Sequence, residues 1–275
     1  MYNLWDITNQ KTCNILMIGN SFCQFYLDEL LAMTESAGIP CRISCLIAGA
    51  CTLVQHWTWC ETNEKRYRMH TYNAAGFTAM ENIGLQECLE QAEWDIISYQ
   101  DGEHYYRLGG MESAAAHTEP YLGNLVKYVR ERFPDAVHCF HQVWAYQVGY
   151  NRPEKSPFQV PDEQSQDSMH QDLRTLSLEA CTRHALIRIP SGDAWYIARK
   201  DPRIGDTLCM NDCEHDGETG GQYLNACVWF DMLFGFRHIG KTFQSKYDLT
   251  EEKKLALQSA AQEAVMGVKK AGCTQ

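Results

Sequence analysis

The sequence predicts an α/β fold, a three-layer α/β/α sandwich around a mainly parallel sheet of five strands. Short apolar runs rich in Ile, Val and Cys alternate with longer segments of helical periodicity, which is the rhythm of β-α units. Several apolar runs are continuous rather than alternating, as expected for strands that are covered on both faces. The chain shows no internal repeat and no low-complexity tract. We therefore expect residues 1–275 to form a single domain.

Five segments are predicted to be strands because they are short, apolar and bounded by glycine, proline or polar residues. In chain order they are CNILMI (13–18), CRISCLIA (41–48), WDIISYQ (94–100), AVHCFHQVW (136–144) and ALIRIP (185–190).

Six segments are predicted to be helices, and all but the second end at a glycine, a proline or a basic residue, which are common helix stops. They are FYLDELLAMTESAG (25–38), MENIGLQECLEQA (80–92), YLGNLVKYVRERFP (121–134), DEQSQDSMHQDLRTLSLEACTRH (162–184), GGQYLNACVWFDMLFG (220–235) and TEEKKLALQSAAQEAVMGVKK (250–270). Between them, residues 146–165 form one long loop, and long loops within a domain are often functional.

Composition narrows the classes of function. The formal charge of -11 argues against a nucleic-acid partner, which requires a concentrated basic face. Thirteen cysteines are spread from Cys13 to Cys273, and this odd number in a long chain indicates reduced thiols rather than a disulfide scaffold. The sequence shows neither a secretory signal nor an apolar run long enough to span a membrane. We expect a cytoplasmic protein without a cofactor or a membrane partner.

Ser21 follows the first predicted strand in the segment NILMIGNSFCQ. Gly19 allows a sharp turn, and a serine at the start of the next helix has an exposed hydroxyl and backbone N–H groups without helical partners. Both features suit a nucleophile in acyl transfer. Serine is also a favoured helix N-cap, so this segment alone leaves both roles open.

A serine nucleophile needs a base and a group that orients the base. Asp212 precedes His215 by three residues in the segment MNDCEHDGETGGQYL, and this spacing lets the two side chains face the same way. A solvated acidic loop with a chance histidine is the alternative. A metal site at Cys209, Cys213 and His215 is a further one, but the spacing fits no strong zinc template, and we predict no metal.

A strand-terminal Gly-Asn-Ser near the N-terminus and Asp-x-x-His near the C-terminus resemble the SGNH (GDSL) hydrolase superfamily over nearly the whole chain. The segments GACTLVQHW, HQVWAY, IPSGDAW and DGETGGQYLNACVW resemble those of a bacterial branch known only as a domain of unknown function. The resemblance implies a flavodoxin-like sheet and a triad of Ser21, Asp212 and His215.

The resemblance also implies an oxyanion hole, made by the backbone N–H groups of Ser21 and Gly49 and by one side-chain donor. The superfamily usually has an asparagine after the third strand, where this sequence has SYQDGEHYY. Gln100 is our choice of donor because its carboxamide donates as asparagine does. His104 is the alternative. Asn20 replaces the usual aspartate of the first block, which is not a triad member.

Aromatic residues follow several predicted strands and are expected at the same sheet edge as Ser21. Flat apolar rings with polar tips suit a sugar ring or a small acyl alcohol, although any one of them could equally be core. The candidate substrate-binding residues are His56, Trp57, His104, Tyr105, Trp144 and Tyr146.

Together these features predict a serine ester hydrolase for short, acetyl-type acyl groups, with acetylated oligosaccharides as candidate substrates. A lysophospholipase or thioesterase is the alternative within enzymes and would require a long apolar groove. A carbohydrate-binding protein without turnover is the alternative from another class. The altered third block favours it, and the intact triad argues against it. The sequence does not determine the oligomeric state.

Overall fold

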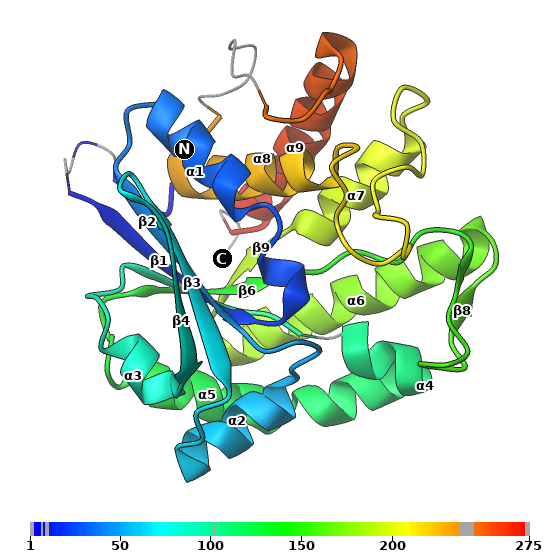
Figure 1. The fold of residues 1–275 in the computed structure, drawn as a ribbon. Coiled ribbons are helices and arrows are strands. Elements are labelled where there is room, and N and C mark those ends of the chain that lie inside the picture. The colour runs from blue at the N-terminus through cyan, green and yellow to red at the C-terminus, as the bar shows by residue number, and fades with distance from the viewer. Residues whose placement is uncertain (1–2, 7, 9–10, 102, 237–244, 273–275) are drawn as a thin grey trace.

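A seven-stranded sheet in the order β4-β3-β2-β1-β5-β6-β9 forms the centre of the structure (Figure 1). The coordinates are a computed structural model that describes all residues except 1–2, 7, 9–10, 102, 237–244 and 273–275. The side chains of residues 103–105 and 271–272 also lie outside this description.

The five predicted strands are all present and form the parallel part of the sheet, in the order β2-β1-β5-β6-β9. This is the flavodoxin-like order, in which the third strand of the parallel set lies beside the first. The fold class predicted from the sequence is therefore confirmed. The strands are β1 (Cys13–Gly19), β2 (Cys41–Ile47), β5 (Ile96–Tyr99), β6 (Val137–His141) and β9 (Ile187–Ile189).

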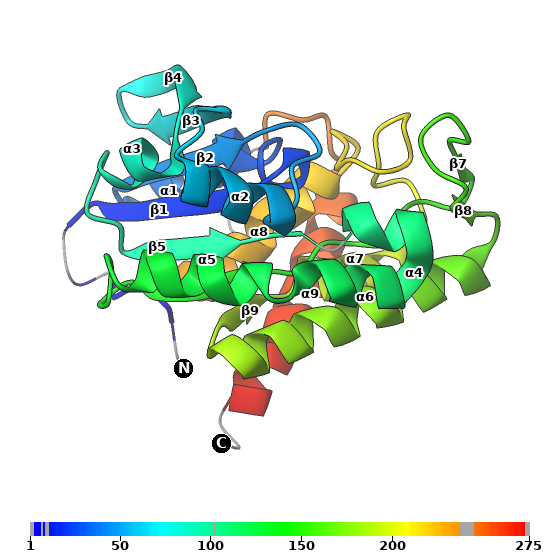
Figure 2. The same ribbon diagram turned by 90° about the horizontal axis from the view of Figure 1, so that it is seen from below.

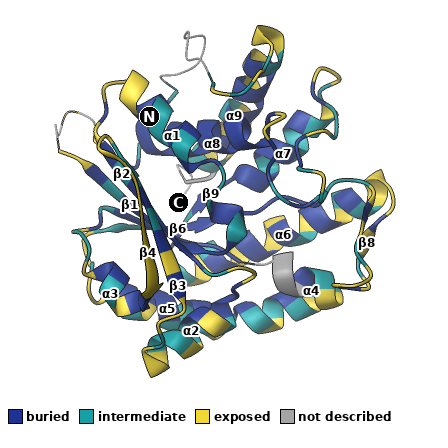
Figure 3. Ribbon diagram, in the orientation of Figure 1, coloured by how far each residue is buried: buried dark blue, intermediate teal, exposed yellow. Residues whose placement is uncertain are grey.

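Two antiparallel strands that the sequence analysis did not predict extend the sheet beyond β2. They are β3 (Tyr67–Asn73) and β4 (Gly76–Ile83), and the second is mostly exposed (Figure 3). The helix predicted over 80–92 is wrong in its first part, because residues 80–83 belong to β4 and α3 covers only Leu85–Leu89. An exposed edge strand buries too little surface to impose an apolar pattern on its sequence.

Helices cover both faces of the sheet. In β1, Ile15 and Met17 belong to one hydrophobic core, whereas Leu16 and Ile18 belong to the other, as the alternation of side chains in a strand requires. The first core lies under α1 (Leu27–Ser36), α7 (Ser191–Lys200), α8 (Gly221–Phe234) and α9 (Glu251–Gly272). The second lies under α2 (Leu53–Thr62), α3 and α5 (Tyr121–Arg130).

The remaining elements are α6, α4 and a small pair of strands. Helix α6 (Glu163–His184) packs against β6 and β9, near the edge of the sheet opposite the β3–β4 hairpin (Figure 2). Helix α4 (Glu103–Thr118) is kinked at Gly109 and Gly110. The predicted long loop contains the small strand pair β7 (Tyr150–Asn151) and β8 (Gln159–Val160) and the first turn of α6. Helices α2, α4 and α7 were not predicted.

Candidate active site

The turn after β1 holds Ser21 at the carboxyl edge of the sheet, where the 3-10 helix η1 (Ser21–Cys23) begins. Asn20 caps η1, because its Oδ1 accepts a hydrogen bond from Phe22 N–H at 3.1 Å. The Asn20 Nδ2 donates to the carbonyl of Cys51 at 3.2 Å, which ties the turn to the segment after β2. A Cβ at Gly19 would lie only 2.5 Å from Gln100 Oε1, so glycine is required there.

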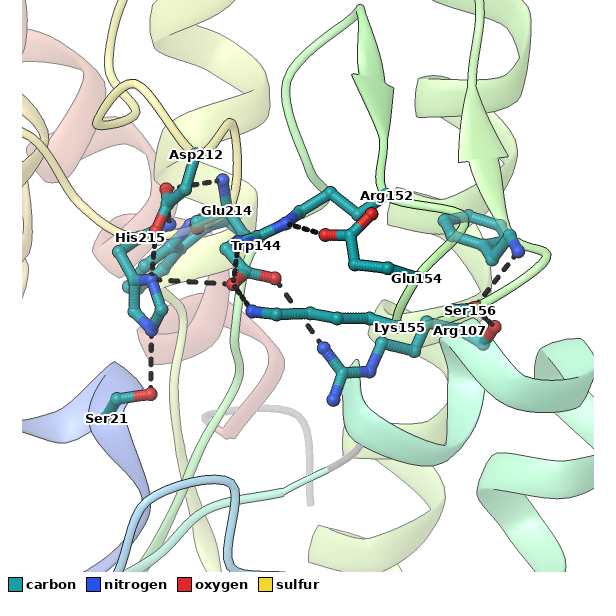
Figure 4. A network of polar contacts seen from close by, with 11 residues as sticks. Ser21, Arg107, Trp144, Arg152, Glu154, Lys155, Ser156, Asp212, Glu214 and His215 are labelled. Carbon is teal, nitrogen blue, oxygen red and sulfur yellow. Dashed lines mark hydrogen bonds and ion pairs between the residues drawn. The ribbon is translucent and has the colours of Figure 1, made fainter.

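Ser21, His215 and Asp212 form one chain of hydrogen bonds (Figure 4). The distance from Ser21 Oγ to His215 Nε2 is 2.7 Å, and His215 Nδ1 lies 2.6 Å from Asp212 Oδ2. A carboxylate only accepts hydrogen bonds, so His215 carries its proton on Nδ1 and its Nε2 accepts from the serine hydroxyl. This is the geometry that a serine nucleophile and its base require.

Local hydrogen bonds keep the Asp212 carboxylate ionised and raise the pKa of His215. Burial raises the pKa of the Asp212 carboxyl, but donors from the His215 ring and from the backbone N–H groups of Glu214 and His215 outweigh burial and hold the pKa well below its usual range. Burial lowers the pKa of His215, and the hydrogen bond and charge of Asp212 more than offset this, so it lies above its usual value. His215 is thus a stronger base than an isolated imidazole.

Hydrogen bonds from the segment that follows β6 hold the loop that carries Asp212 and His215. Trp144 Nε1 donates to the carbonyl of Glu214 at 2.9 Å, and Gln147 N–H donates to the carbonyl of Cys213 at 2.8 Å. Within the loop, Met210 N–H donates to the carbonyl of His215 at 2.8 Å. The base is therefore positioned by a network that reaches into the core.

Glu214, which the sequence analysis did not identify, is a buried acid beside the triad (Figure 4). Its carboxylate lies 3.7 Å from Arg107, 3.4 Å from Arg152 and 3.3 Å from Lys155. Its Oε1 is also 3.8 Å from His215 Nδ1. Three cations around one carboxylate tie α4 and the 150–156 segment to the loop that carries Asp212 and His215. Glu214 lies within the recognised NDCEHD motif, but no local pattern connects it with cations about 60 and 100 residues away.

A small pocket of about 170 Å³ opens beside Ser21. Its walls include Ala50 from the segment after β2, Arg107 from α4 and Tyr146 from the segment after β6. The other lining residues are Asn20, Ser21, Phe22, Lys155, Glu214 and His215. We call this space the nucleophile pocket.

The predicted oxyanion donors occupy different places around this pocket. Gly49 is exposed in the turn after β2, next to Ala50, which lines the pocket. Gln100 is fully buried beneath the turn, where its Oε1 accepts from Asn20 N–H at 3.1 Å and from Cys23 Sγ at 3.3 Å. Gln100 is absent from the lining of the nucleophile pocket as the described residues define it. The alternative donor, His104, has a side chain outside the described part.

Of the aromatic residues predicted to bind substrate, the structure places Tyr146 in the lining of the nucleophile pocket. Trp144 is buried and stacks on Trp195, with ring centroids 4.4 Å apart. His56 is buried and lies 2.9 Å from the Tyr67 hydroxyl, and burial lowers its pKa to about 4. Trp57 packs against the second core. None of these three side chains belongs to the described lining of the nucleophile pocket, and Trp144 and His56 are fully buried. The side chain of Tyr105 lies outside the described residues.

Asp212, Glu214 and His215 present ligand atoms within 4.8 Å of one another, a geometry that suits a metal ion. Each of these three residues already interacts with other side chains. His215 bonds both Ser21 and Asp212, and Glu214 lies beside three cationic side chains that would repel a cation. The donor set therefore fits a hydrogen-bonded triad better than a metal site. The cysteines weighed as ligands do not belong to this cluster.

Comparisons with solved structures agree with this fold. A protein from Bacteroides uniformis, described as a DUF4886 family protein, is 28% identical, with 93% of this chain and 95% of that chain aligned at a TM-score of 0.79. A candidate SGNH hydrolase from Slackia heliotrinireducens is 18% identical, with 81% and 99% covered at a TM-score of 0.52. The acetyl xylan esterase AlAXEase is 11% identical, with 78% and 98% covered at a TM-score of 0.51. At these lower identities the likeness shows the fold alone.

No curated protein matches the sequence. Among the described residues, no helix combines the length and the apolar character needed to cross a membrane. The model of one family, the domain of unknown function DUF4886, matches residues 14–264. The chain therefore belongs to the DUF4886 family, on a fold that it shares with SGNH hydrolases.

Proposed function

We propose that this protein is a serine ester hydrolase that cleaves short acyl groups. The observation that carries the proposal is the chain of hydrogen bonds from Ser21 through His215 to Asp212, at 2.7 Å and 2.6 Å, beside an open pocket. A serine hydroxyl is a weak nucleophile until a base removes its proton. Here His215 Nε2 lies within hydrogen-bonding distance of the Ser21 hydroxyl, and Asp212 fixes the tautomer of His215.

The reaction has two stages. His215 Nε2 takes the proton of Ser21 as Oγ attacks the ester carbonyl, and the imidazolium then gives that proton to the departing alcohol oxygen. Water attacks the resulting acyl-enzyme, again losing a proton to His215, and Ser21 Oγ leaves with that proton. Asp212 stays ionised throughout and stabilises the imidazolium.

For the oxyanion we propose the backbone N–H groups of Ser21 and Gly49 together with the Gln100 carboxamide. The start of η1 and the turn after β2 both border the nucleophile pocket, which supports the two backbone donors. Each donor of this kind contributes about 3 kcal/mol to the stability of the transition state. Gln100 has weaker support, since its oxygen already accepts from Asn20 beneath the turn.

The size of the nucleophile pocket supports a short acyl group. Its volume of about 170 Å³ is below the range of roughly 300–1,000 Å³ that is usual for larger ligands. A lysophospholipase or long-chain thioesterase would need a longer apolar groove than this pocket offers. The shared fold with an acetyl xylan esterase is in keeping with an acetyl-type substrate.

The test compares the wild-type protein with Ser21→Ala on 4-nitrophenyl esters from C2 to C12. We expect the rate to be highest on the shortest esters and to fall roughly 10⁶-fold in the variant. A fluorophosphonate probe should label Ser21, as mapped by mass spectrometry.

Ser191→Ala is the matched control. Ser191 Oγ also lies 2.9 Å from a histidine, His141 Nε2, but both residues are fully buried. This variant should keep most of the activity and all of the labelling. Equal hydrolysis by the wild type and Ser21→Ala would overturn the proposal and favour a binding protein without turnover.

A further inference from the structure

A second pocket, of about 340 Å³, is lined by Phe25, whose ring contacts that of His215. It is lined by aromatic side chains from separate elements: Phe25 before α1, His70 and Tyr72 on β3, and Tyr247 before α9. None of these residues was a candidate in the sequence analysis. We call this space the hairpin pocket, because β3 of the β3–β4 hairpin forms one wall.

The hairpin pocket is linked to Ser21 and His215 through three of its lining residues. The Phe25 ring meets the His215 ring edge-on with centroids 5.4 Å apart. Gln24 donates its N–H to the carbonyl of Ser21 at 3.4 Å, and Met210 donates its N–H to the carbonyl of His215. A group bound here can therefore contact Phe25, the ring that packs against the proposed base.

The aromatic surface continues outward from the hairpin pocket along the hairpin. Phe77 on β4 contacts Tyr72 and His70, with ring centroids 5.0 Å and 5.2 Å apart. Phe77 is 55% exposed, which is unusual for so large an apolar side chain in this protein. A ridge of rings that leads from a pocket to solvent suits a flat ligand longer than one ring.

The polar residues of the hairpin pocket indicate the charge of its ligand. Asp28 and Lys246 form an ion pair with each other, and Gln222 accepts a hydrogen bond from the Tyr247 hydroxyl. Glu218 adds a carboxylate without a compensating cation in the pocket lining. The lining thus carries a net negative charge, which disfavours anionic ligands. Carboxylates accept hydrogen bonds from hydroxyl groups, and carboxamides both accept from them and donate to them.

We propose that the hairpin pocket binds the alcohol part of the substrate and that this part is a neutral sugar. The inference rests on the proposed function, since His215 must protonate the departing alcohol oxygen, and the alcohol must therefore lie beside His215. The nucleophile pocket then receives the acyl group. Aromatic faces stack on the C–H faces of sugar rings, while the polar rim bonds their hydroxyls.

The first experiment compares two substrates, xylobiose carrying a single O-acetyl group and methyl acetate, in wild type, Tyr72→Ala and Tyr72→Leu. The alcohol part of methyl acetate is too small to reach the rings of the hairpin pocket. Tyr72→Leu preserves apolar volume in case the alanine variant folds poorly. We expect kcat/KM for the sugar ester to fall roughly tenfold in either variant, with methyl acetate hydrolysis unchanged. The matched control is Tyr196→Ala, since Tyr196 is another half-buried tyrosine and lines a different pocket. Equal losses on both substrates, or none on the sugar ester, would overturn the inference.

The second experiment measures binding without turnover. Xylobiose carrying a single O-acetyl group is titrated into Ser21→Ala protein, with and without Tyr72→Leu, and the affinity is read by calorimetry. Weaker binding with Tyr72→Leu supports the hairpin pocket, and unchanged affinity contradicts it. Failure of the proposed function is a separate result, because it appears as an inactive wild type on both substrates.

Discussion

Ser21 and His215 are 194 residues apart in the sequence, and their side chains meet at 2.7 Å. The parallel sheet brings them together, because β1 ends at the same edge where the 209–216 loop is hydrogen-bonded to the segment after β6. Asp212 lies at Nδ1, on the other side of the His215 ring, and fixes the tautomer of His215. The candidate chemistry depends on this one contact.

The role of Asp212 can be tested by Asp212→Asn. The asparagine amide can donate to His215 Nδ1, which favours the tautomer with its proton on Nε2 and so removes the acceptor for Ser21. We expect kcat on 4-nitrophenyl acetate to fall roughly 10⁴-fold. Asp135→Asn, at an exposed aspartate, should have no effect. A loss of less than tenfold would mean that Asp212 does not orient the base.

The pH dependence of the wild type should report His215. The base must be neutral to accept the proton, and Asp212 raises the pKa of His215 above its usual 6.5. We therefore expect kcat/KM to rise with pH through an apparent pKa above 6.5. In Asp212→Asn, whatever its residual rate, this limb should move to lower pH. Steady-state kinetics from pH 5 to 9 measure both, and an acid limb below 6 in the wild type would contradict the assignment.

Glu214 should matter for stability because it lies beside three cations. Glu214→Gln removes the charge that balances Arg107, Arg152 and Lys155, and we expect a loss of roughly 2–3 kcal/mol in the free energy of unfolding. Glu154→Gln is the matched control, since Glu154 pairs with the same Arg152 but its side chain is 62% exposed. Its loss should be much smaller, because solvent screens an exposed ion pair. Urea unfolding compares the two, and equal losses would refute a structural role for Glu214.

Asp216, directly after His215, is a buried acid whose charge opposes folding. Burial raises its pKa to about 7 from 3.8, so above about pH 4 the unfolded chain loses a proton that the folded protein keeps. Its contribution to stability therefore falls as the pH rises from 4 to 7, by about 4 kcal/mol at most. Asp216→Asn should stabilise the protein at pH 8 more than at pH 4.5 in urea unfolding. The same gain at both values would contradict the raised pKa.

Gln100 has two candidate roles that one variant separates. Gln100→Met removes both the carboxamide donor and the acceptor of Asn20 N–H. If Gln100 donates to the oxyanion, kcat should fall roughly 10²-fold with little change in KM. A loss of stability of about 1–3 kcal/mol with kcat within tenfold of wild type would instead assign Gln100 to holding the nucleophile turn.

Local patterns in the sequence were sufficient for the parallel strands, and together with the family resemblance they identified Ser21, Asp212 and His215 as candidate site residues. The segment around Ser21 shows a buried strand, a glycine and a cap within a few residues, and Asp212 and His215 are close enough in sequence to recognise as a pair. In β3 and β4 the same reasoning failed, because an exposed hairpin at a sheet edge carries little apolar periodicity. The aromatic residues after strands were a poor guide for a similar reason. Position after a strand does not determine whether a ring faces solvent, and Trp144 and His56 are core.

By itself, the sequence determined the α/β class and the five parallel strands and predicted Ser21, Asp212 and His215 as site residues, since each is encoded in a short segment. Only the tertiary structure decided which distant groups surround them. The three cations beside Glu214, the place of Gln100 beneath the turn and the rings of the hairpin pocket come from segments that no local pattern links. Their proximity follows from how the sheet twists and the helices pack, because distances between remote segments depend on the packing of the whole chain.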